Sequence, residues 1–368
     1  MEPLTTLRWL GPARLDITSL KMANNPTPST MRIWKFASAQ GGLEKHLKLH
    51  TSQPLPKPKP NQHLVQVLAV GLNPVDYKPA EAPLIGRLVV VKPITPGFDF
   101  SGRIITPADG SPLGPGQLIF GQASTNPLAG GALAEYIAAP TETVCTIPPG
   151  LSPLIAGGAP VAAITAYGSL IPHIRAGSRV FLNGGSGGVG TYGIQIAKAA
   201  GAHVTVSCSA RNADLCRSLG ADDVLDYTTR PLLDQLRDAA AKAGGPFDHV
   251  VDNVFNDPAL YYQAHTYTTP SAKFIEVASG PSLAFIRFAI GAQIWPGFLG
   301  GGRRKLVLFI SENKRETLEL LASWIVEGKI KPVTDQVFAM EDAVGAFERL
   351  KTGRAVGKVI IDVAGKGQ

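Results

Sequence analysis

The sequence predicts an α/β protein in which a β-rich domain precedes a doubly wound parallel sheet. The chain has 368 residues, of which 45% are apolar and 17% charged, a globular composition too long for one ordinary core. Up to about residue 150, short apolar runs alternate with Pro and Gly, which is typical of strands and turns. Beyond it, strand-like and helix-like runs alternate, and such alternation builds a parallel sheet covered by helices.

Residues 1–30 differ in composition from the rest and are predicted to form a disordered N-terminal extension. An upstream start codon has the same signature, and a mitochondrial transit peptide is the less favoured alternative because Glu2 and Asp16 are unfavourable there. The three cysteines form no paired framework, which favours reduced thiols and a cytoplasmic location.

The β-rich domain is predicted to span residues 31–152. Its strands are expected where apolar runs are bounded by turn residues. The runs are MRIWKF (31–36), HLVQVLAVGLN (63–73), FDFSGRII (98–105), QLIFG (117–121) and ALAEYIAA (132–139).

The parallel sheet is predicted to span residues 153–310, and residues 311–368 form a separate C-terminal segment. Strands are expected at RVFLNG, HVTVSCS, DHVVDNV and KFIEVAS, and helices at GVGTYGIQIAKAAGA and ADLCRSLGA. The C-terminal segment is predicted to contain two helices, at about 314–327 and at EDAVGAFERLK, and two strands, at PVTDQVFAM and KVIIDV.

Charge and hydropathy exclude two function classes. Lys and Arg exceed Asp and Glu by 35 to 28, but these charges are scattered and no basic-aromatic ladder is present, which argues against nucleic-acid binding. A mildly basic surface suits an anionic cofactor or an anionic substrate carrier. The most apolar stretch, 283–299, contains Arg287 and Pro296, so we expect a buried helix or pocket wall there and no membrane span.

A glycine-rich loop, FLNGGSGGVG (181–190), carries the first functional signal. Gly185, Gly187 and Gly190 form G-x-G-x-x-G between a predicted strand and a predicted helix. In this context the first glycine permits the tight turn, the second admits a pyrophosphate, and the third allows close helix–strand packing. The loop predicts a dinucleotide site, the alternative being a glycine-rich turn without ligand.

The end of the next strand indicates which dinucleotide is bound. An NAD site has an acid about 20 residues after the first glycine, to bind the ribose 2′-hydroxyl. Here Ser209 and Arg211 occupy that region, and no carboxylate occurs before Asp214. These donors favour NADPH, although Arg211 on a solvated loop would look the same.

Together these features resemble the medium-chain dehydrogenase/reductase superfamily, in its zinc-free branch of quinone oxidoreductases and enoyl reductases. The resemblance runs from Met31 to about Val363 and implies a GroES-like domain, a Rossmann domain and a C-terminal segment that returns to the first domain. The active site would lie in the cleft between the domains. The markers are GLNPVDYK, PGFDFSG, GGALAEYIAAP, APVAAITAYGSL, the glycine loop, SLGADDVLDY and GRAVGKVIIDV.

The resemblance also implies that no metal is bound. Zinc alcohol dehydrogenases of the superfamily place a Cys ligand where this chain has Asn73, a His-Glu pair at Phe98-Asp99 and a further Cys near Val161. A catalytic zinc needs three N, S or O ligands in matched geometry, which these residues do not supply.

The resemblance assigns cofactor contacts position by position. Asn73, Val75 and Asp76 would line the nicotinamide side, and Thr165 lies in a segment that resembles a substrate-lining helix. The pyrophosphate loop would comprise Gly185, Ser186, Gly187, Gly188, Val189 and Gly190. The adenosine and 2′-phosphate would contact Ser209, Ala210, Arg211, Asn212 and Tyr227, and Gly357 and Lys358 would form a C-terminal contact.

The implied activity is reduction of an enone, enoyl thioester or quinone by hydride transfer from NADPH. A donor must then face the carbonyl oxygen, and Tyr77 and Lys78 are the nearest candidates, unless they are a cleft-wall aromatic and a solvent or cofactor contact. Two alternatives remain: a trans-acting enoyl reductase partner of a polyketide synthase, and an NADPH-binding protein without turnover. The expected assembly is a monomer or homodimer.

Overall fold

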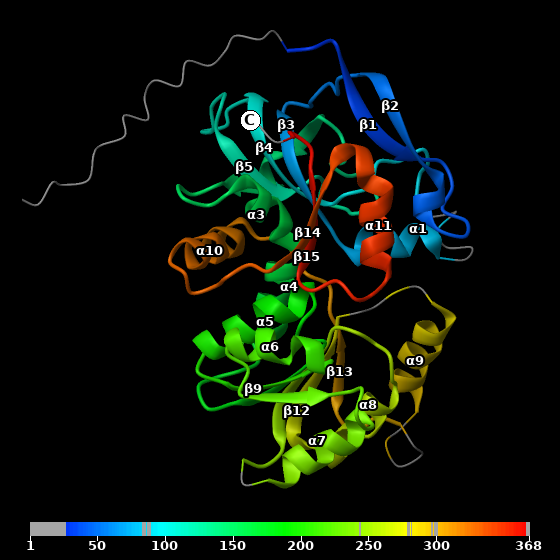
Figure 1. Ribbon diagram of the computed structural model, residues 1–368, viewed down its shortest axis with the longest axis vertical. Helices are drawn as coiled ribbons and strands as arrows, with labels where there is room; N and C mark the ends of the chain where they lie inside the picture. The colour runs from blue at the N-terminus through cyan, green and yellow to red at the C-terminus, as the bar shows by residue number, and fades with distance from the viewer. Residues whose placement is uncertain are drawn as a thin grey trace, which may run out of the picture.

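The computed structural model describes residues 27–365, except 83–85, 87–89, 243, 278, 279, 281, 296 and 298–300. Two layers follow one another along the long axis of the molecule, a β-rich layer and a parallel sheet, with α3 (Pro153–Gly158), α4 (Pro160–Leu170) and α5 (Gly188–Ala199) between them (Figure 1). The predicted fold class is confirmed. Most of the predicted N-terminal extension lies outside the described residues.

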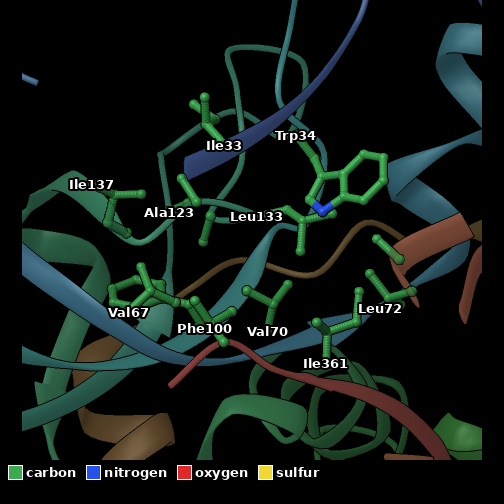
Figure 2. Packing of buried hydrophobic residues seen from close by; sticks show 14 of the residues in the cluster. Ile33, Trp34, Val67, Val70, Leu72, Phe100, Ala123, Leu133, Ile137 and Ile361 are labelled. Atoms are coloured by element: carbon green, nitrogen blue, oxygen red, sulfur yellow. The ribbon is translucent and has the colours of Figure 1, made fainter. Parts of the chain in front are cut away.

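The β-rich layer consists of a seven-stranded sheet and a separate pair of strands. β3 (Gln62–Leu72) is central and pairs antiparallel with β4 (Asp99–Thr106) and β6 (Tyr136–Pro140). β5 (Leu118–Gln122) and β7 (Val144–Thr146) extend the β4 side, and β1 (Thr30–Phe36) pairs with β2 (Leu47–Pro54). Figure 2 shows Trp34 of β1 packed with residues of β3 and β4, and its Nε1 donates to the Met340 carbonyl at 2.8 Å.

The second sheet is parallel and has six strands in the order β10-β9-β8-β11-β12-β13. Numbered from β8, this order is 3-2-1-4-5-6, the doubly wound topology in which a ligand crevice opens where the order reverses, between β8 and β11. The strands are β8 (Arg179–Asn183), β9 (His203–Cys208), β10 (Asp223–Asp226), β11 (Phe247–Asp252), β12 (Thr268–Glu276) and β13 (Lys305–Leu308). The helices are α5, α6 (Ala213–Ser218), α7 (Leu232–Ala241), α8 (Ala259–Tyr262) and α9 (Leu283–Ile294).

The C-terminal part returns to the first sheet. β15 (Lys358–Asp362) pairs antiparallel with β3, and β14 (Thr334–Ala339) pairs parallel with β15. α11 (Ala343–Lys351) lies against this sheet, whereas α10 (Arg315–Val326) packs on α4. Short helices complete the described chain: α1 (Lys78–Glu81) and the 3₁₀ turns Leu43–His46, Pro74–Asp76, Thr141–Thr143, Ala210–Asn212, Ala264–Thr266 and Met340–Asp342.

The apolar stretch 283–299 corrects one expectation. Residues 283–294 form α9, but four of the large apolar side chains in this stretch are exposed, so the helix is buried on one face only. They are Leu283, Ile290, Ile294 and Trp295. Pro296 and Leu299, at the end of the stretch, lie outside the described residues. Among the residues that the structure describes, no helix is long and apolar enough to cross a membrane.

Candidate cofactor cleft and active site

The glycine loop connects β8 to α5 at the point where the strand order reverses. Gly184 adopts a φ of 82°, so the left-handed turn lies one residue before the motif's first glycine. The Gly184 N–H donates to Ser207 Oγ at 2.9 Å, and the Ser207 hydroxyl donates to Asn183 Oδ1 at 2.6 Å. Side chains of two neighbouring strands therefore hold the turn from below.

The three motif glycines meet different surroundings. A β-carbon at Gly190 would overlap the Gly184 carbonyl oxygen, and one at Gly185 would lie 2.7 Å from Val206 Cβ. At Gly187 the nearest atom would be the Gly184 carbonyl oxygen at 3.5 Å, which leaves an open approach at the N-terminus of α5. The loop therefore fits a pyrophosphate, which would accept N–H bonds at this helix end.

A chain of contacts joins the predicted cofactor residues across the two sheets. Asn212 Nδ2 donates to Ser186 Oγ at 3.0 Å, and the Gly357 N–H donates to the Ser186 carbonyl at 3.0 Å. The next residue, Lys358, runs past Gly188, where an added β-carbon would lie 3.2 Å from Lys358 Cδ. The C-terminal segment thus borders the glycine loop.

Lys358 ends in a buried polar cluster. Its ammonium donates to the Leu72 carbonyl at 2.8 Å and to Asn73 Oδ1. Asn73 Nδ2 donates to Asp99 Oδ2 at 2.8 Å, and the Asn73 N–H donates to Asp76 Oδ2 at 2.7 Å. The α4 N-terminus joins the cluster because the Val161 N–H donates to Asp99 at 3.0 Å. Asn73, Asp99 and Val161, the positions compared with zinc ligands, therefore bond to one another and to Lys358.

Burial dominates the ionisation of this cluster. It raises the pKa of Asp99 to about 7 and that of Asp76 to about 6, against the opposing effects of Lys358 and of the hydrogen bonds that each accepts. Burial also lowers the pKa of Lys358, which both carboxylates oppose. One buried cation facing two carboxyls leaves room for a proton near neutral pH.

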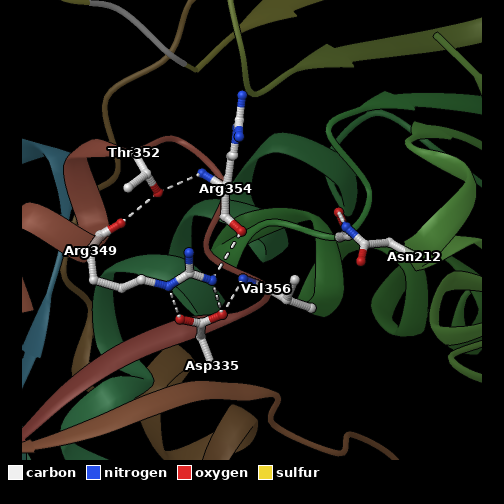
Figure 3. Close-up of polar contacts among 7 residues, drawn as sticks. Asn212, Asp335, Arg349, Thr352, Arg354 and Val356 are labelled. Atoms are coloured by element: carbon white, nitrogen blue, oxygen red, sulfur yellow. Dashed lines mark hydrogen bonds and ion pairs between the residues drawn. The ribbon is translucent and has the colours of Figure 1, made fainter. Parts of the chain in front are cut away.

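A second feature is a groove of about 630 Å³ between Asn212 and the C-terminal segment. Figure 3 shows the polar contacts of the residues around it. Arg211 and Asn212 line it from the β9 side and Arg349 and Arg354 from the C-terminal segment; Thr352 and Val356 complete the lining. Exposed guanidinium groups at both sides make the groove suitable for a phosphate.

The arginines of this groove have different surroundings. The Arg349 guanidinium donates two hydrogen bonds of 2.7 Å to the Asp335 carboxylate, which neutralises its charge. Asp335 also accepts the Val356 N–H at 2.8 Å, which shapes the loop that carries Arg354. Arg354 and Arg211 are exposed, so their guanidinium groups remain accessible to a ligand.

Two more residues at this end of the sheet bear on the ligand. The buried Ser209 hydroxyl has no hydrogen-bond partner among the described residues. The carboxylate of Asp226 is occupied by the Thr228 hydroxyl at 2.7 Å and the Thr228 N–H at 2.9 Å. The local acid is therefore already bonded, which suits a 2′-phosphate better than a free carboxylate would.

The two predicted catalytic residues face different surroundings. The Tyr77 ring packs against the β-rich core, with the Lys351 ammonium 5.5 Å from its centroid. Lys78 instead faces Glu276 at the end of β12, and a β-carbon at Gly280 would lie 3.4 Å from Lys78 Cδ. Burial lowers the pKa of Lys78, and the buried carboxylate of Glu276 opposes this. Lys78 thus spans from the β-rich layer to the parallel sheet.

The remaining predicted residues lie outside these contacts. Thr165 is buried within α4, and Val75 borders a cavity of about 20 Å³, too small for a substrate. Ala210 is exposed and Tyr227 is half exposed after β10. Val189 is partly buried in the first turn of α5 and packs on the neighbouring core. Cofactor contact by these residues stays a prediction.

Sequence reasoning missed three residues of the cleft. The resemblance points to Asp99 only as a replaced zinc ligand, and it assigns no role to Glu276 or Arg354. An acid closing an apolar strand, as in KFIEVAS, is a usable signal for Glu276. Arg354 precedes the Gly357-Lys358 pair by only three residues, but only the fold brings it to Arg211.

No metal cluster is evident in the part of the chain that the structure describes. It holds no group of three His, Cys, Asp or Glu side chains arranged to bind a metal ion. At the compared positions, Asn73 and Asp99 already bond to each other and the cluster includes the Lys358 ammonium. This donor set does not fit zinc.

Comparisons with known proteins cover nearly the whole chain. Residues 59–149 match the alcohol dehydrogenase GroES-like domain, and residues 219–361 match the zinc-binding dehydrogenase family. The chain is 45% identical over 351 residues to trans-enoyl reductase pgmF of Aspergillus terreus, covering 91% of this chain and 97% of that protein. It is 31% identical over 333 residues to a chloroplastic quinone-oxidoreductase homolog of Spinacia oleracea, covering 88% and 96%. The structure of the quinone oxidoreductase from Coxiella burnetii superimposes with a TM-score of 0.78 at 28% identity, covering 90% of this chain and 99% of that one.

Proposed function

The chain belongs to the medium-chain dehydrogenase/reductase superfamily, and from that premise we propose that it is a metal-free, NADPH-dependent reductase of carbon–carbon double bonds conjugated to a carbonyl, or of quinones. The superfamily and the Rossmann-type sheet imply a nicotinamide cofactor. The observation that carries the proposal is the cluster of Asn73, Asp99 and Lys358, in which hydrogen bonds among the chain's own residues occupy the positions compared with zinc ligands.

The choice of NADPH is supported by the arginine groove. Arg211 and Arg354 face the edge of the glycine loop, where the adenosine end of a dinucleotide would lie. A 2′-phosphate would gain charge-assisted bonds from both guanidinium groups and a bond from the orphan Ser209 hydroxyl. NADH has no group to use these donors.

The reaction class is supported by the donor set around Asn73 and by the chemistry that hydride transfer requires of the chain. Alcohol oxidation needs a stabilised alkoxide, which zinc provides in related enzymes, and the donor set around Asn73 does not fit zinc. When bound, NADPH supplies the hydride that reaches the β-carbon of the enone. The chain must then stabilise negative charge on the carbonyl oxygen and deliver a proton to the α-carbon or the oxygen.

Lys78 is the residue that we place in this role. It lies between the β-rich layer and the end of β12, and the Glu276 carboxylate raises its pKa against the larger, lowering effect of burial. It can donate a hydrogen bond to the carbonyl oxygen and then transfer a proton, leaving a neutral amine that water reprotonates. Tyr77 packs into the core, so we give it no role in proton transfer.

The proposal extends to substrate and compartment. The names of the A. terreus and S. oleracea relatives support an enoyl or quinone substrate, free or carried by a polyketide synthase. The enzyme would act as a monomer or homodimer. Three free, buried cysteines support a reducing compartment, the cytoplasm.

The test is a steady-state assay with the purified chain. NADPH oxidation is followed with an enone, crotonyl thioester and a quinone, and NADP⁺ reduction with simple alcohols. We expect turnover with at least one activated alkene or quinone, and zinc well below one ion per chain by elemental analysis. Faster oxidation of alcohols, or stoichiometric zinc whose removal abolishes activity, would overturn the proposal.

A further inference from the structure

One segment of the surface contributes no residue to the glycine loop or to the arginine groove. Between Glu276 and Glu312 the sequence contains no Asp or Glu but has Arg287, Arg303, Arg304 and Lys305. α9 lies within this segment, beside the parallel sheet and on the same side of the molecule as α1 (Figure 1).

The inner face of α9 is well packed. Phe285 and Phe288 are buried and lie 5.0 Å, centroid to centroid, from the ring of Phe255. Phe288 also contacts Tyr261 at 5.5 Å and Tyr262 at 5.8 Å. This aromatic layer fixes the helix on the sheet and determines which face points outward.

The outer face of α9 is also apolar. Leu283, Ile290 and Ile294 are 76%, 53% and 69% exposed, and Trp295, directly after the helix, is 58% exposed. Positions 283, 287, 290 and 294 follow one stripe of a helix, with Arg287 in its middle. We call Leu283, Arg287, Ile290, Ile294, Trp295 and the nearby Arg303 the α9 surface.

A helix that is apolar on both faces is normally covered on both. The 12 residues of α9 span only about 18 Å, short of the roughly 30 Å of a bilayer core. Helices that lie on membranes have a strongly charged polar face, whereas the second face of α9 is an aromatic core contact. A protein partner fits these facts better than a lipid surface.

The charge of the α9 surface specifies the partner. Arg287 and Arg303 are exposed, and Arg303 Nε donates to the Gly297 carbonyl at 3.3 Å, which keeps it near the end of the helix. Arg304 is different, because its guanidinium bonds Thr268 Oγ1 at 2.9 Å and the Thr268 carbonyl at 3.0 Å. The exposed arginines of the α9 surface lie among apolar side chains in a segment without acidic residues. Such a surface complements an acidic protein surface with an apolar centre.

The position of the α9 surface connects it to the active site. Ser282 caps α9 by accepting the Phe285 N–H at 3.1 Å, and its own N–H donates to the Gly280 carbonyl at 2.8 Å. Gly280 borders Lys78, the proposed proton donor. The first residue of α9, Leu283, therefore lies three positions along the chain from Gly280, which borders the proposed proton donor.

We propose that the α9 surface docks an acidic carrier protein that presents the enoyl chain as a thioester on a flexible arm. The inference rests on the proposed reductase function and adds its partner and where that partner binds. Docking along α9 would place the carrier beside Gly280, so that the arm reaches Lys78 from the helix N-terminus.

The test compares a carrier-bound with a free substrate. An acidic acyl carrier protein loaded with a crotonyl group is the first, and the crotonyl thioester of N-acetylcysteamine is the second. The variants are Arg287→Glu and Ile290→Ser, with Lys48→Glu and Val337→Ser as matched controls on exposed positions of β2 and β14. Unchanged melting temperatures establish that each variant is folded.

We expect both α9 variants to lose about tenfold or more in kcat/KM with the carrier-bound substrate, mainly through KM, and to match wild type with the free thioester. The controls should match wild type with both. At saturating NADPH, raising the salt concentration should weaken the carrier reaction more than the free-thioester reaction, since screening acts on the exposed charges of the docking surfaces.

Four results would overturn the docking site. In the first, the α9 variants reduce the carrier-bound substrate as fast as wild type does, and in the second they lose activity equally on both substrates. In the third, the substitutions dissociate a homodimer that sedimentation detects in wild type. In the fourth, wild type binds anionic vesicles through Arg287 and does not bind the carrier. Reduction of the free thioester in any of these cases leaves the reductase function intact. Failure with every enone, quinone and thioester removes the proposed function itself.

Discussion

Arg211 and Arg354 reach the same groove from positions that lie far apart in the chain. Each is exposed, and neighbouring Arg349 is neutralised by Asp335. The structure therefore separates a cation that shapes the loop from two that can contact a ligand. Sequence spacing revealed Arg211 only.

This separation predicts cofactor selectivity. Arg354→Ala and Arg211→Ala should each raise KM for NADPH about tenfold or more, because a charge-assisted bond contributes about 1.5–3 kcal/mol, and leave KM for NADH nearly unchanged. Arg217→Ala, which removes an exposed arginine paired with Asp214 on α6, is the control and should change neither. Equal losses with both cofactors would show that the groove does not bind the 2′-phosphate.

Lys78 and Glu276 give a second prediction. Glu276 raises the pKa of Lys78 against burial, so Glu276→Gln should lower it further. If protonated Lys78 is the donor, the alkaline limb of the pH profile of kcat moves to lower pH in Glu276→Gln. Lys78→Met should lower kcat by about 10²-fold or more and leave the Kd of NADPH unchanged. An unmoved alkaline limb in Glu276→Gln would rule out Lys78 as the titrating group.

Helices and strands with strong periodicity were predictable from the sequence. β3, β8, β9, β11 and α5 appear where apolar runs and the glycine loop placed them. β7 and β13, of three and four residues, carry too few residues for a pattern. The sequence predicts α9 as a helix but does not predict that its second apolar face is exposed. An apolar face has the same residue types whether the protein core or a partner covers it.

The loop before α5 predicts a contrast between two glycines. Gly190→Ala should lower the melting temperature, at a cost of about 1–3 kcal/mol, because its β-carbon would overlap the Gly184 carbonyl. Gly187→Ala should fold normally, since its β-carbon has 3.5 Å of clearance, yet raise KM for NADPH by occupying the phosphate approach. Thermal unfolding and cofactor titration distinguish the two. Normal NADPH binding by Gly187→Ala would contradict the assigned phosphate position.

The molecule as a whole is held together by contacts that cross from one layer to the other. α4 and α5 share a core with Phe120 and Cys145 of the β-rich layer, and Lys358 links the glycine loop to Asn73 and Asp99. The sequence placed Lys358 next to the cofactor through family resemblance. It could not show the buried cluster, because that cluster combines residues from four separate segments that only the folded chain brings together.

The Asp99 carboxyl predicts how this junction responds to pH. Its pKa is 3.8 in the unfolded chain and about 7 in the fold, where burial disfavours the charge. The folded protein therefore holds this proton more tightly, so Asp99 stabilises fully below pH 3.8 and loses that contribution as pH rises toward 7, by at most about 1.4 kcal/mol per pH unit.

Asp99→Asn removes the titration. The free energy of unfolding of wild type minus that of Asp99→Asn, from urea titrations at pH 5, 6 and 7.5, should fall by more than about 1 kcal/mol over the series. Asp226→Asn is the control: the Thr228 hydroxyl lowers the pKa of Asp226 below 3.8, so its difference should stay constant across this range. A constant difference for Asp99→Asn as well would mean that Asp99 is ionised throughout and that Lys358 fully compensates its burial.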